Sequence, residues 1–301
     1  MASEARARTF GELKQSGYRP LTVKEEMRKN LIARIRGGRP MFDGIFGYEE
    51  SVVPQLENAI LSGQDIIFLG ERGQAKSRII RNLVNLLDEA LPVIAGSELN
   101  ESPFEPITNA SRARLEQEGD NLEIEWIGRD RRYGEKLATP DITIADLIGE
   151  VDPIKVAEGR YLADELTIHY GLIPRTNRGI FCINELPDLA ERIQVGLLNI
   201  MEERDVQIRG YRIRMPLDVM VVASANPEDY TNRGRIITPL KDRYGAQIRT
   251  HYPRNVEHEI DIMEQERSAF EDAEYQVTVP HYMKEIVAEI TRLARRSPDV
   301  N

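Results

Sequence analysis

An eight-residue stretch, Gly70–Ser77, has the residue types and spacing of a loop that holds the phosphates of a nucleotide. It reads GERGQAKS and matches the pattern G-x-x-x-x-G-K-[ST] except at Ala75, which replaces the second glycine. In such a loop backbone N–H groups point at the phosphates, Lys76 supplies a point charge and Ser77 offers a hydroxyl to Mg²⁺. We therefore expect ATP and Mg²⁺ as ligands, with contacts from Gly70, Glu71, Arg72, Gly73, Gln74, Ala75, Lys76 and Ser77.

The elements around this loop favour phosphate binding over an ordinary turn with a surface lysine. The apolar run Asp65–Gly70 predicts a buried strand before the loop, and the spacing of apolar residues over Arg78–Leu91 predicts a helix after it. We expect Ala75 to adopt helical backbone angles, at which alanine is unstrained.

A second apolar strand, Gly179–Ile183, is followed by Asn184 and Glu185. Glu185 can polarise a water molecule, whereas Asn184 keeps an acceptor oxygen but carries no charge. With Ser77 and Asn184 as the expected protein ligands of Mg²⁺, two interpretations stay open. The chain is an active ATPase with a neutral metal ligand, or a nucleotide-binding switch with little hydrolysis. Glu185 taken alone also suits an acid near a helix N-terminus.

Two further candidates lie after a third strand, Val219–Ala223. Asn226 follows its carboxyl end, where open α/β sheets bind ligands, so its amide could position the attacking water. An Asn-Pro turn explains the same residue without function. Arg243 could act on a γ-phosphate or form a surface pair with Asp242.

Strands that alternate with helices predict an α/β fold with a mostly parallel sheet. We expect an N-terminal helical extension over 1–40, a core over 41–254 and the start of a helical lid over 255–301, truncated at its end. The segment 96–140 is interpreted as loop-rich, with one strand. The remaining expected elements are helices at Val23–Arg36, Tyr48–Ser62, Arg192–Glu203, Asn255–Ala269 and His281–Arg296, a strand at Asn121–Ile127 and a hairpin at Val206–Pro216.

Composition narrows the function classes. The chain has 301 residues, 41% of them hydrophobic and 30% charged, with a net charge of −10. This acidic balance argues against a general nucleic-acid binder. No apolar run is long enough to span a bilayer, and the N-terminus lacks the apolar core of a secretory signal. A single cysteine, Cys182, excludes an internal disulfide, and we expect a cytoplasmic protein.

In this order, the motifs resemble those of AAA+ ATPases, and more narrowly the clade of the magnesium chelatase I subunit and the MoxR ATPases. The resemblance covers about residues 40–255. Its most specific parts are DLIGEVDP at Asp146–Pro153, GLIP at Gly171–Pro174 and NRGI at Asn177–Ile180. It implies an AAA+ core with an insert in helix 2, a hairpin before the third strand and a helical lid.

The resemblance also implies roles for single residues. Glu185 would be the catalytic glutamate, Asn226 the sensor 1 residue and Arg243 an arginine finger that acts on the ATP of a neighbour. A ring follows, a hexamer by analogy. The segment Asp43–Glu50 is similar to the family's segment beside the adenine, which assigns Phe46 and Gly47 to ATP binding.

Family members use ATP turnover to remodel a partner with a von Willebrand A domain, or to assist metal insertion. The resemblance therefore implies a motor that acts on a protein. The alternatives are an MCM-like nucleic-acid motor, to which the basic hairpin with Arg209, Arg212 and Arg214 would fit, and the nucleotide-dependent switch.

Overall fold

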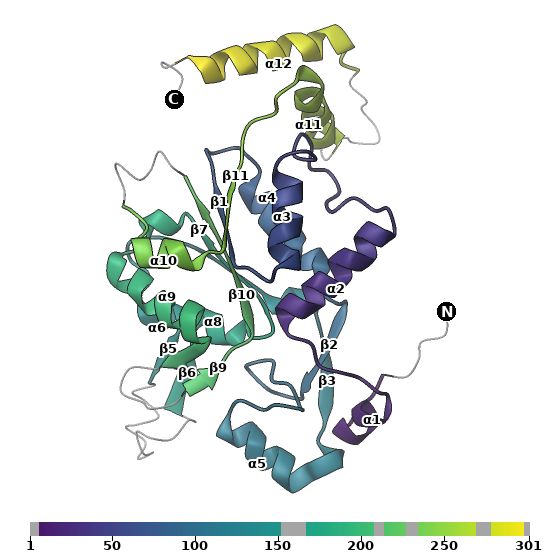
Figure 1. Ribbon diagram of the computed structural model, residues 1–301, viewed down its shortest axis with the longest axis vertical. Coiled ribbons are helices and arrows are strands. Elements are labelled where there is room, and N and C mark those ends of the chain that lie inside the picture. Colours follow the sequence, from purple (N-terminus) through teal and green to yellow (C-terminus); the bar gives the residue numbers. More distant parts are fainter. Residues whose placement is uncertain (1–5, 152–166, 208–213, 227–233, 269–277, 298–301) are drawn as a thin grey trace.

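A five-stranded parallel sheet forms the centre of the molecule (Figure 1). The computed structural model describes residues 6–151, 167–207, 214–226, 234–268 and 278–297. The strand order is β11-β1-β10-β7-β4, and every pairing in this sheet is parallel. This confirms the expected α/β fold. The strands are β1 Ile66–Leu69, β4 Tyr133–Leu137, β7 Gly179–Asn184, β10 Val219–Ala225 and β11 Ala246–Arg249.

Helices cover both faces of this sheet, as the continuous apolar runs of its central strands require. In β1, Ile66 and Phe68 belong to the core on one face and Ile67 to the core on the other. The first face carries α2 (Val23–Arg36), α3 (Val52–Leu61) and α4 (Lys76–Asn82), and the second carries α6 (Ile144–Leu147), α8 (Leu172–Arg175), α9 (Glu191–Glu203) and α10 (Thr238–Arg243) (Figure 1).

The helix expected over Arg78–Leu91 is shorter than its sequence pattern. It ends at Asn82, continues as a 3₁₀ turn over Leu83–Leu86 and gives way to a strand, β2, at Ala90–Ile94. That strand pairs antiparallel with β3 (Ile124–Gly128), and α5 (Asn109–Glu118) lies between the two in sequence. Residues 96–140 therefore hold more regular structure than expected, including β4 of the central sheet.

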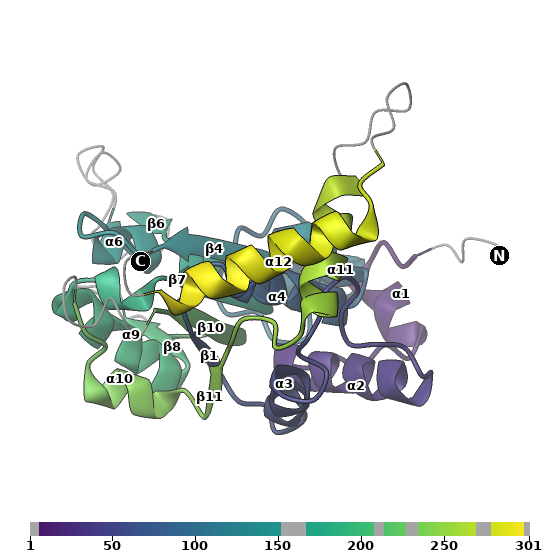
Figure 2. The same cartoon turned by 90° about the horizontal axis from the view of Figure 1, so that it is seen from above.

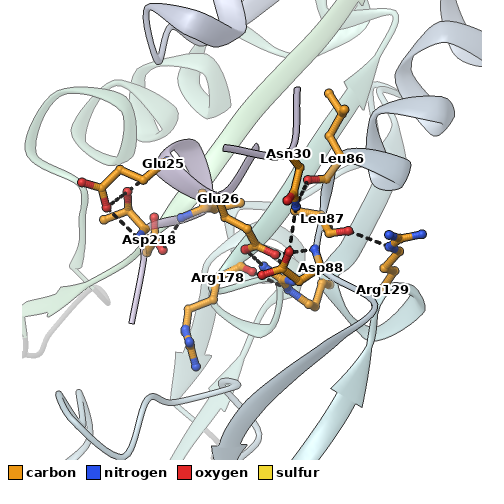
Figure 3. Close-up of polar contacts among 12 residues, drawn as sticks. Glu25, Glu26, Asn30, Leu86, Leu87, Asp88, Arg129, Arg178 and Asp218 are labelled. Carbon is orange, nitrogen blue, oxygen red and sulfur yellow. Dashed lines mark hydrogen bonds and ion pairs between the residues drawn. The ribbon is translucent and has the colours of Figure 1, made fainter. Parts of the chain in front are cut away.

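The N-terminal segment is attached to this β2–β3 unit and to the sheet. Helix α1 (Phe10–Gln15) places Phe10 in a small core with Ile94 and Leu122. Helix α2 is held by a buried ion pair in which Arg132 donates to both carboxylate oxygens of Glu26. The Asp88 N–H also donates to Glu26 (Figure 3). Because these groups lie far apart in sequence, the contact fixes α2 against the segment that leads into β4.

Two insertions and a terminal helical pair complete the described fold. Strands β5 (Gly149–Val151) and β6 (Ile168–Tyr170) pair antiparallel, as do β8 (Asp205–Gln207) and β9 (Arg214–Pro216), which precede β10. Arg209 and Arg212 of the basic hairpin lie outside the described residues. Helices α11 (Val256–Ser268) and α12 (His281–Arg296) pack on each other at the end of the molecule that faces the viewer in Figure 2. No helix among the described residues has the length and apolarity to cross a membrane.

Candidate functional site

A cavity of about 340 Å³ opens where β1, β7 and β10 end. This volume lies near the lower limit of ordinary small-molecule pockets, which is about 300 Å³. The cavity brings together the phosphate loop, the residues that follow the second strand and the residue that follows the third. Its lining comprises Arg72, Gly73, Gln74, Ala75, Lys76, Ser77, Arg78, Leu137, Asn184, Glu185, Ser224, Ala225 and Asn226.

The phosphate loop is ordered by its own side chains. Lys76 Nζ donates to the carbonyl oxygens of Gly70 and Glu71, each at 2.6 Å. The buried side chain of Gln74 accepts hydrogen bonds from the Glu71 N–H at 3.1 Å and from the Thr250 hydroxyl at 2.7 Å. A Cβ atom at Gly70 would lie 1.9 Å from that Thr250 oxygen, so glycine is required there.

The backbone of Ala75 differs from the expectation. Its φ and ψ are +54° and +16°, in the left-handed region, and the helix begins at the next residue. The prediction of helical angles was wrong because Ala75 is the turn residue before the helix and not part of the helix. A Cβ atom in this region costs about 1–2 kcal/mol relative to glycine, so the replaced glycine had a conformational role.

Residues outside the motif hold the loop against neighbouring elements. The Tyr48 hydroxyl lies 2.8 Å from the carbonyl oxygens of both Gln74 and His251, and burial raises the pKa of Tyr48 to about 12. The Tyr252 hydroxyl donates to the Arg72 carbonyl at 2.7 Å. The loop is thus tied to the segment that follows β11, a contact that the motif itself does not reveal.

Glu185 and Asn226 both border the cavity. Glu185 has a left-handed backbone (φ +55°, ψ +48°), which turns the chain sharply after β7, and its N–H donates to the Ser224 hydroxyl at 3.2 Å. Strained backbone of this kind is frequent at functional sites. Asn226 is buried directly after β10. The structure therefore places both predicted residues beside the phosphate loop.

Asn184 contacts a carboxylate that the sequence analysis missed. Its side-chain nitrogen lies 2.5 Å from Glu135 Oε1 on β4, and its side-chain oxygen accepts from the Ser224 hydroxyl at 3.2 Å. Glu135 belongs to an edge strand, which has no long apolar run, so its place in the sheet was not visible in the hydrophobic pattern. The sequence YGEKL of β4 gives only a weak indication of a strand. Its larger side chains Tyr133, Glu135 and Leu137 occupy every second position, but only two of them are hydrophobic.

Five predicted residues lie outside the cavity lining, and two of them, Gly70 and Glu71, begin the phosphate loop itself. Arg243, at the end of α10, pairs at 2.6 Å with Glu202 of α9. Phe46 and Gly47 precede Tyr48 in a segment that packs on α11, where a Cβ atom at Gly47 would lie 2.9 Å from His258 Nδ1. In the single chain, Arg243 therefore belongs to the α9–α10 contact and not to the cavity.

A larger cavity of about 660 Å³ lies elsewhere and does not contain these groups. Two of its basic side chains, Lys24 and Arg204, are paired with the buried carboxylate of Asp65. Its residues come from the chain before β7 and β10, from the start of α2 with the segment before it, and from the segment 102–112. Because ligands of open parallel sheets bind at the carboxyl ends, we assign the candidate site to the smaller cavity.

Comparisons with known proteins agree on the relatives of this chain. A magnesium-chelatase subunit ChlI from Nostoc sp. is 28% identical over 265 residues, which cover 85% of this chain and 64% of that protein. A chloroplast ChlI from Oryza sativa subsp. indica is 27% identical, covering 76% of this chain and 53% of that protein. The chain is similar to magnesium chelatase I subunits over most of its length.

Two further comparisons concern the fold of this chain. The family model of the sigma-54 interaction domain matches residues 158–240. In a cryo-EM model of the complex between BchI and BchD of magnesium chelatase, one chain superimposes with a TM-score of 0.52 at 20% identity, covering 85% of this chain and 76% of that chain. The fold is therefore the AAA+ core that the motifs predicted. This chain spans 64% or less of the length of the two ChlI proteins.

Proposed function

We propose that this chain binds ATP with Mg²⁺ in the cavity beside Gly70–Ser77 and hydrolyses the bond between its β- and γ-phosphates. The observation that carries the proposal is the convergence of the phosphate loop, Glu185 and Asn226 on one cavity. Such an arrangement supplies the parts that phosphoryl transfer to water needs, which are phosphate positioning, charge stabilisation and an oriented water molecule.

The oxygen donors at the site fit Mg²⁺. Mg²⁺ keeps several water molecules and is bound through one or two protein groups together with substrate phosphates. Ser77 and Asn184 both border the cavity, and a hydroxyl and an amide oxygen are hard ligands of this kind. No cluster of three or more His, Cys, Asp or Glu side chains suited to a metal occurs within the described part of the chain, in keeping with a metal that arrives with the nucleotide.

Each predicted residue has one role in this proposal. Lys76 turns from the loop carbonyls towards the outer phosphates, Glu185 polarises the attacking water, and Asn226 orients it. Phe46 and Gly47 lie beside the adenine. Arg243 leaves Glu202 and reaches the γ-phosphate held by a neighbouring subunit.

An arginine acting between subunits requires a ring, which we propose to be hexameric. The acidic net charge of −10 favours a protein as the object of the motor. We take this object to be a partner with a von Willebrand A domain, or a metal-insertion reaction, for which the name magnesium chelatase of the similar proteins speaks. A cytoplasmic location is part of the same proposal. The neutral side chain of Asn184 favours a second candidate function, a nucleotide-dependent switch that hydrolyses little ATP.

Phosphate release in the presence of ATP and Mg²⁺ tests hydrolysis and separates the two candidates. We expect turnover by the protein and a loss of about 100-fold or more in Glu185→Gln, because removal of a positioned general base typically costs 10²–10⁴. The variant keeps the size of the side chain and should still bind ATP, which serves as its folding control. Equal rates in the two proteins would contradict hydrolysis at this site and favour the switch.

A further inference from the structure

Asn184 is held between two other strands in a defined orientation. Its side-chain nitrogen faces Glu135 of β4 at 2.5 Å, and its oxygen faces the Ser224 hydroxyl of β10 at 3.2 Å and Cys182 Sγ at 3.5 Å. An ionised carboxylate only accepts hydrogen bonds, so the nitrogen of the amide must be the atom that faces Glu135. The amide oxygen of Asn184 is therefore directed away from Glu135.

Glu135 also contacts the helix that follows the phosphate loop. Arg81 of α4 donates from Nε to Oε2 at 2.9 Å and from Nη2 to Oε1 at 3.0 Å, and the Tyr133 hydroxyl lies 2.9 Å from Oε2. Arg81 and Tyr133 thus engage both oxygens of the Glu135 carboxylate. It connects α4 directly to the end of β7.

The two charges of this ion pair differ in exposure. The side chain of Glu135 is 21% exposed, whereas that of Arg81 is 64% exposed. Water screens the exposed arginine more strongly than the half-buried carboxylate. Glu135 is therefore the less hydrated of the two charges, and it lies directly against Asn184.

We propose that Glu135 is a positioning residue that supplies, through the Asn184 amide, the negative charge at the metal end of the ATP site. This inference rests on the proposed binding of ATP with Mg²⁺. A hydrogen bond from an amide to a carboxylate polarises the amide and makes its oxygen a better ligand for a cation or its water shell. Glu135, on β4, thus supplies the negative charge that the neutral side chain of Asn184 on β7 lacks.

The same geometry explains why position 184 holds a neutral side chain. An aspartate there would face Glu135 at hydrogen-bond distance, and two carboxylates that share a site cannot both ionise easily. Asparagine has the same shape and donates the hydrogen bond that Glu135 accepts. The neutral residue and the carboxylate on the neighbouring strand form a matched pair.

The Mg²⁺ dependence of ATP binding tests this inference without measuring turnover. ATP binding is followed at increasing Mg²⁺ concentration in the unmodified protein, in Glu135→Gln and in Arg81→Met. We expect Glu135→Gln to raise the Mg²⁺ concentration for half-maximal binding by about 10-fold, the lower end of the effect of removing a partner of a metal ligand. Arg81→Met breaks the same ion pair but keeps the carboxylate, so its Mg²⁺ requirement should be unchanged or lower.

A purely structural role of the Arg81–Glu135 pair predicts a different result. Both variants would then alter the Mg²⁺ dependence equally, and that outcome would overturn the inference. Thermal unfolding without nucleotide shows whether either variant is misfolded. If Glu135→Gln is too unstable, the Arg81→Met variant still tests the inference, because a raised Mg²⁺ requirement in it would contradict the role of the carboxylate.

Moving the carboxylate from β4 to β7 gives a second test. In the double variant Glu135→Gln with Asn184→Asp, a carboxylate stands at position 184 and an amide at position 135. We expect the Mg²⁺ requirement to recover to within about 3-fold of the unmodified protein or to fall below it, and no recovery over Glu135→Gln would contradict the inference. Should the unmodified protein bind no ATP at any Mg²⁺ concentration, both the proposed function and this inference fail. If the unmodified protein binds ATP and Glu135→Gln has the same Mg²⁺ dependence, only this inference fails and the proposed function stands.

Discussion

At the scale of single residues, Ala75 shows how a motif can be recognised while its geometry is misjudged. The match to the phosphate-loop pattern located the loop correctly, but the backbone angle of Ala75 depends on where the helix begins. That boundary lies at Lys76 and leaves Ala75 in the left-handed region. Hydrophobic spacing does not resolve a boundary to one residue, so the sequence could not predict this angle.

The strain at Ala75 makes its replacement by glycine a direct test. We expect Ala75→Gly to raise the free energy of unfolding by up to about 1 kcal/mol, since relief of the left-handed strain exceeds the entropy gained by the unfolded chain. Urea unfolding measures the change. Gly73, with φ +76° and only an ordinary 3.8 Å contact between a Cβ atom and Tyr252 Cε1, provides the matched control, because Gly73→Ala should lower stability by a similar amount. A less stable Ala75→Gly protein would contradict the assigned conformation.

The candidate site was predictable where a residue directly follows a buried strand. Glu185 and Asn226 were found in this way, and both border the cavity. Glu135 and Tyr48 were not found as contacts of the site, because each reaches it from an element whose position depends on tertiary packing. Asn184 was identified as unusual, but its partner could be seen only in the structure.

At the scale of elements, the sequence predicted the central strands and missed the edges. Strands β1, β7 and β10 are covered on both faces and paired on both sides, so they are continuous apolar runs. The edge strands β4 and β11 have the sequences YGEKL and AQIR, in which charged or polar residues interrupt the apolar run. One open edge relaxes the requirement for apolar residues, and the hydrophobic pattern weakens accordingly.

The attachment of α2 rests on a buried ion pair that can be tested separately. Glu26→Gln leaves the Arg132 guanidinium buried without a counter-charge, and we expect a loss of about 3–5 kcal/mol in the free energy of unfolding. The neighbouring Glu25 is exposed and caps the same helix, a position that glutamine also fills (Figure 3). Glu25→Gln should therefore cost less than about 1 kcal/mol. Similar losses in the two variants, measured by urea unfolding, would show that the Arg132–Glu26 pair does not anchor α2.

At the scale of the whole molecule, the account requires more than one chain. The cavity holds the phosphate loop, Glu185 and Asn226, whereas Arg243 is paired with Glu202 outside the cavity lining. A composite site between subunits reconciles these positions, since Arg243 would meet the nucleotide of the next chain. Hydrolysis then depends on assembly, while nucleotide binding does not.

Complementation between two inactive variants tests the composite site. We expect Arg243→Ala to lower turnover by about 10³-fold or more while ATP binding is retained, in line with the effect of arginine fingers. Mixing Arg243→Ala with Glu185→Gln should restore part of the turnover, because some neighbouring pairs then combine an intact Glu185 with an intact Arg243. If the mixture is no more active than the sum of its components, Arg243 does not act between subunits.

Titration calorimetry with ATP and Mg²⁺ shows whether Gly70–Ser77 holds the triphosphate of ATP. We expect saturable binding of one ATP per chain, weakened by about 10-fold or more in Lys76→Ala, because a hydrogen bond to a charged group contributes about 1.5–3 kcal/mol. Absence of binding, or equal affinity in the two proteins, would contradict the claim.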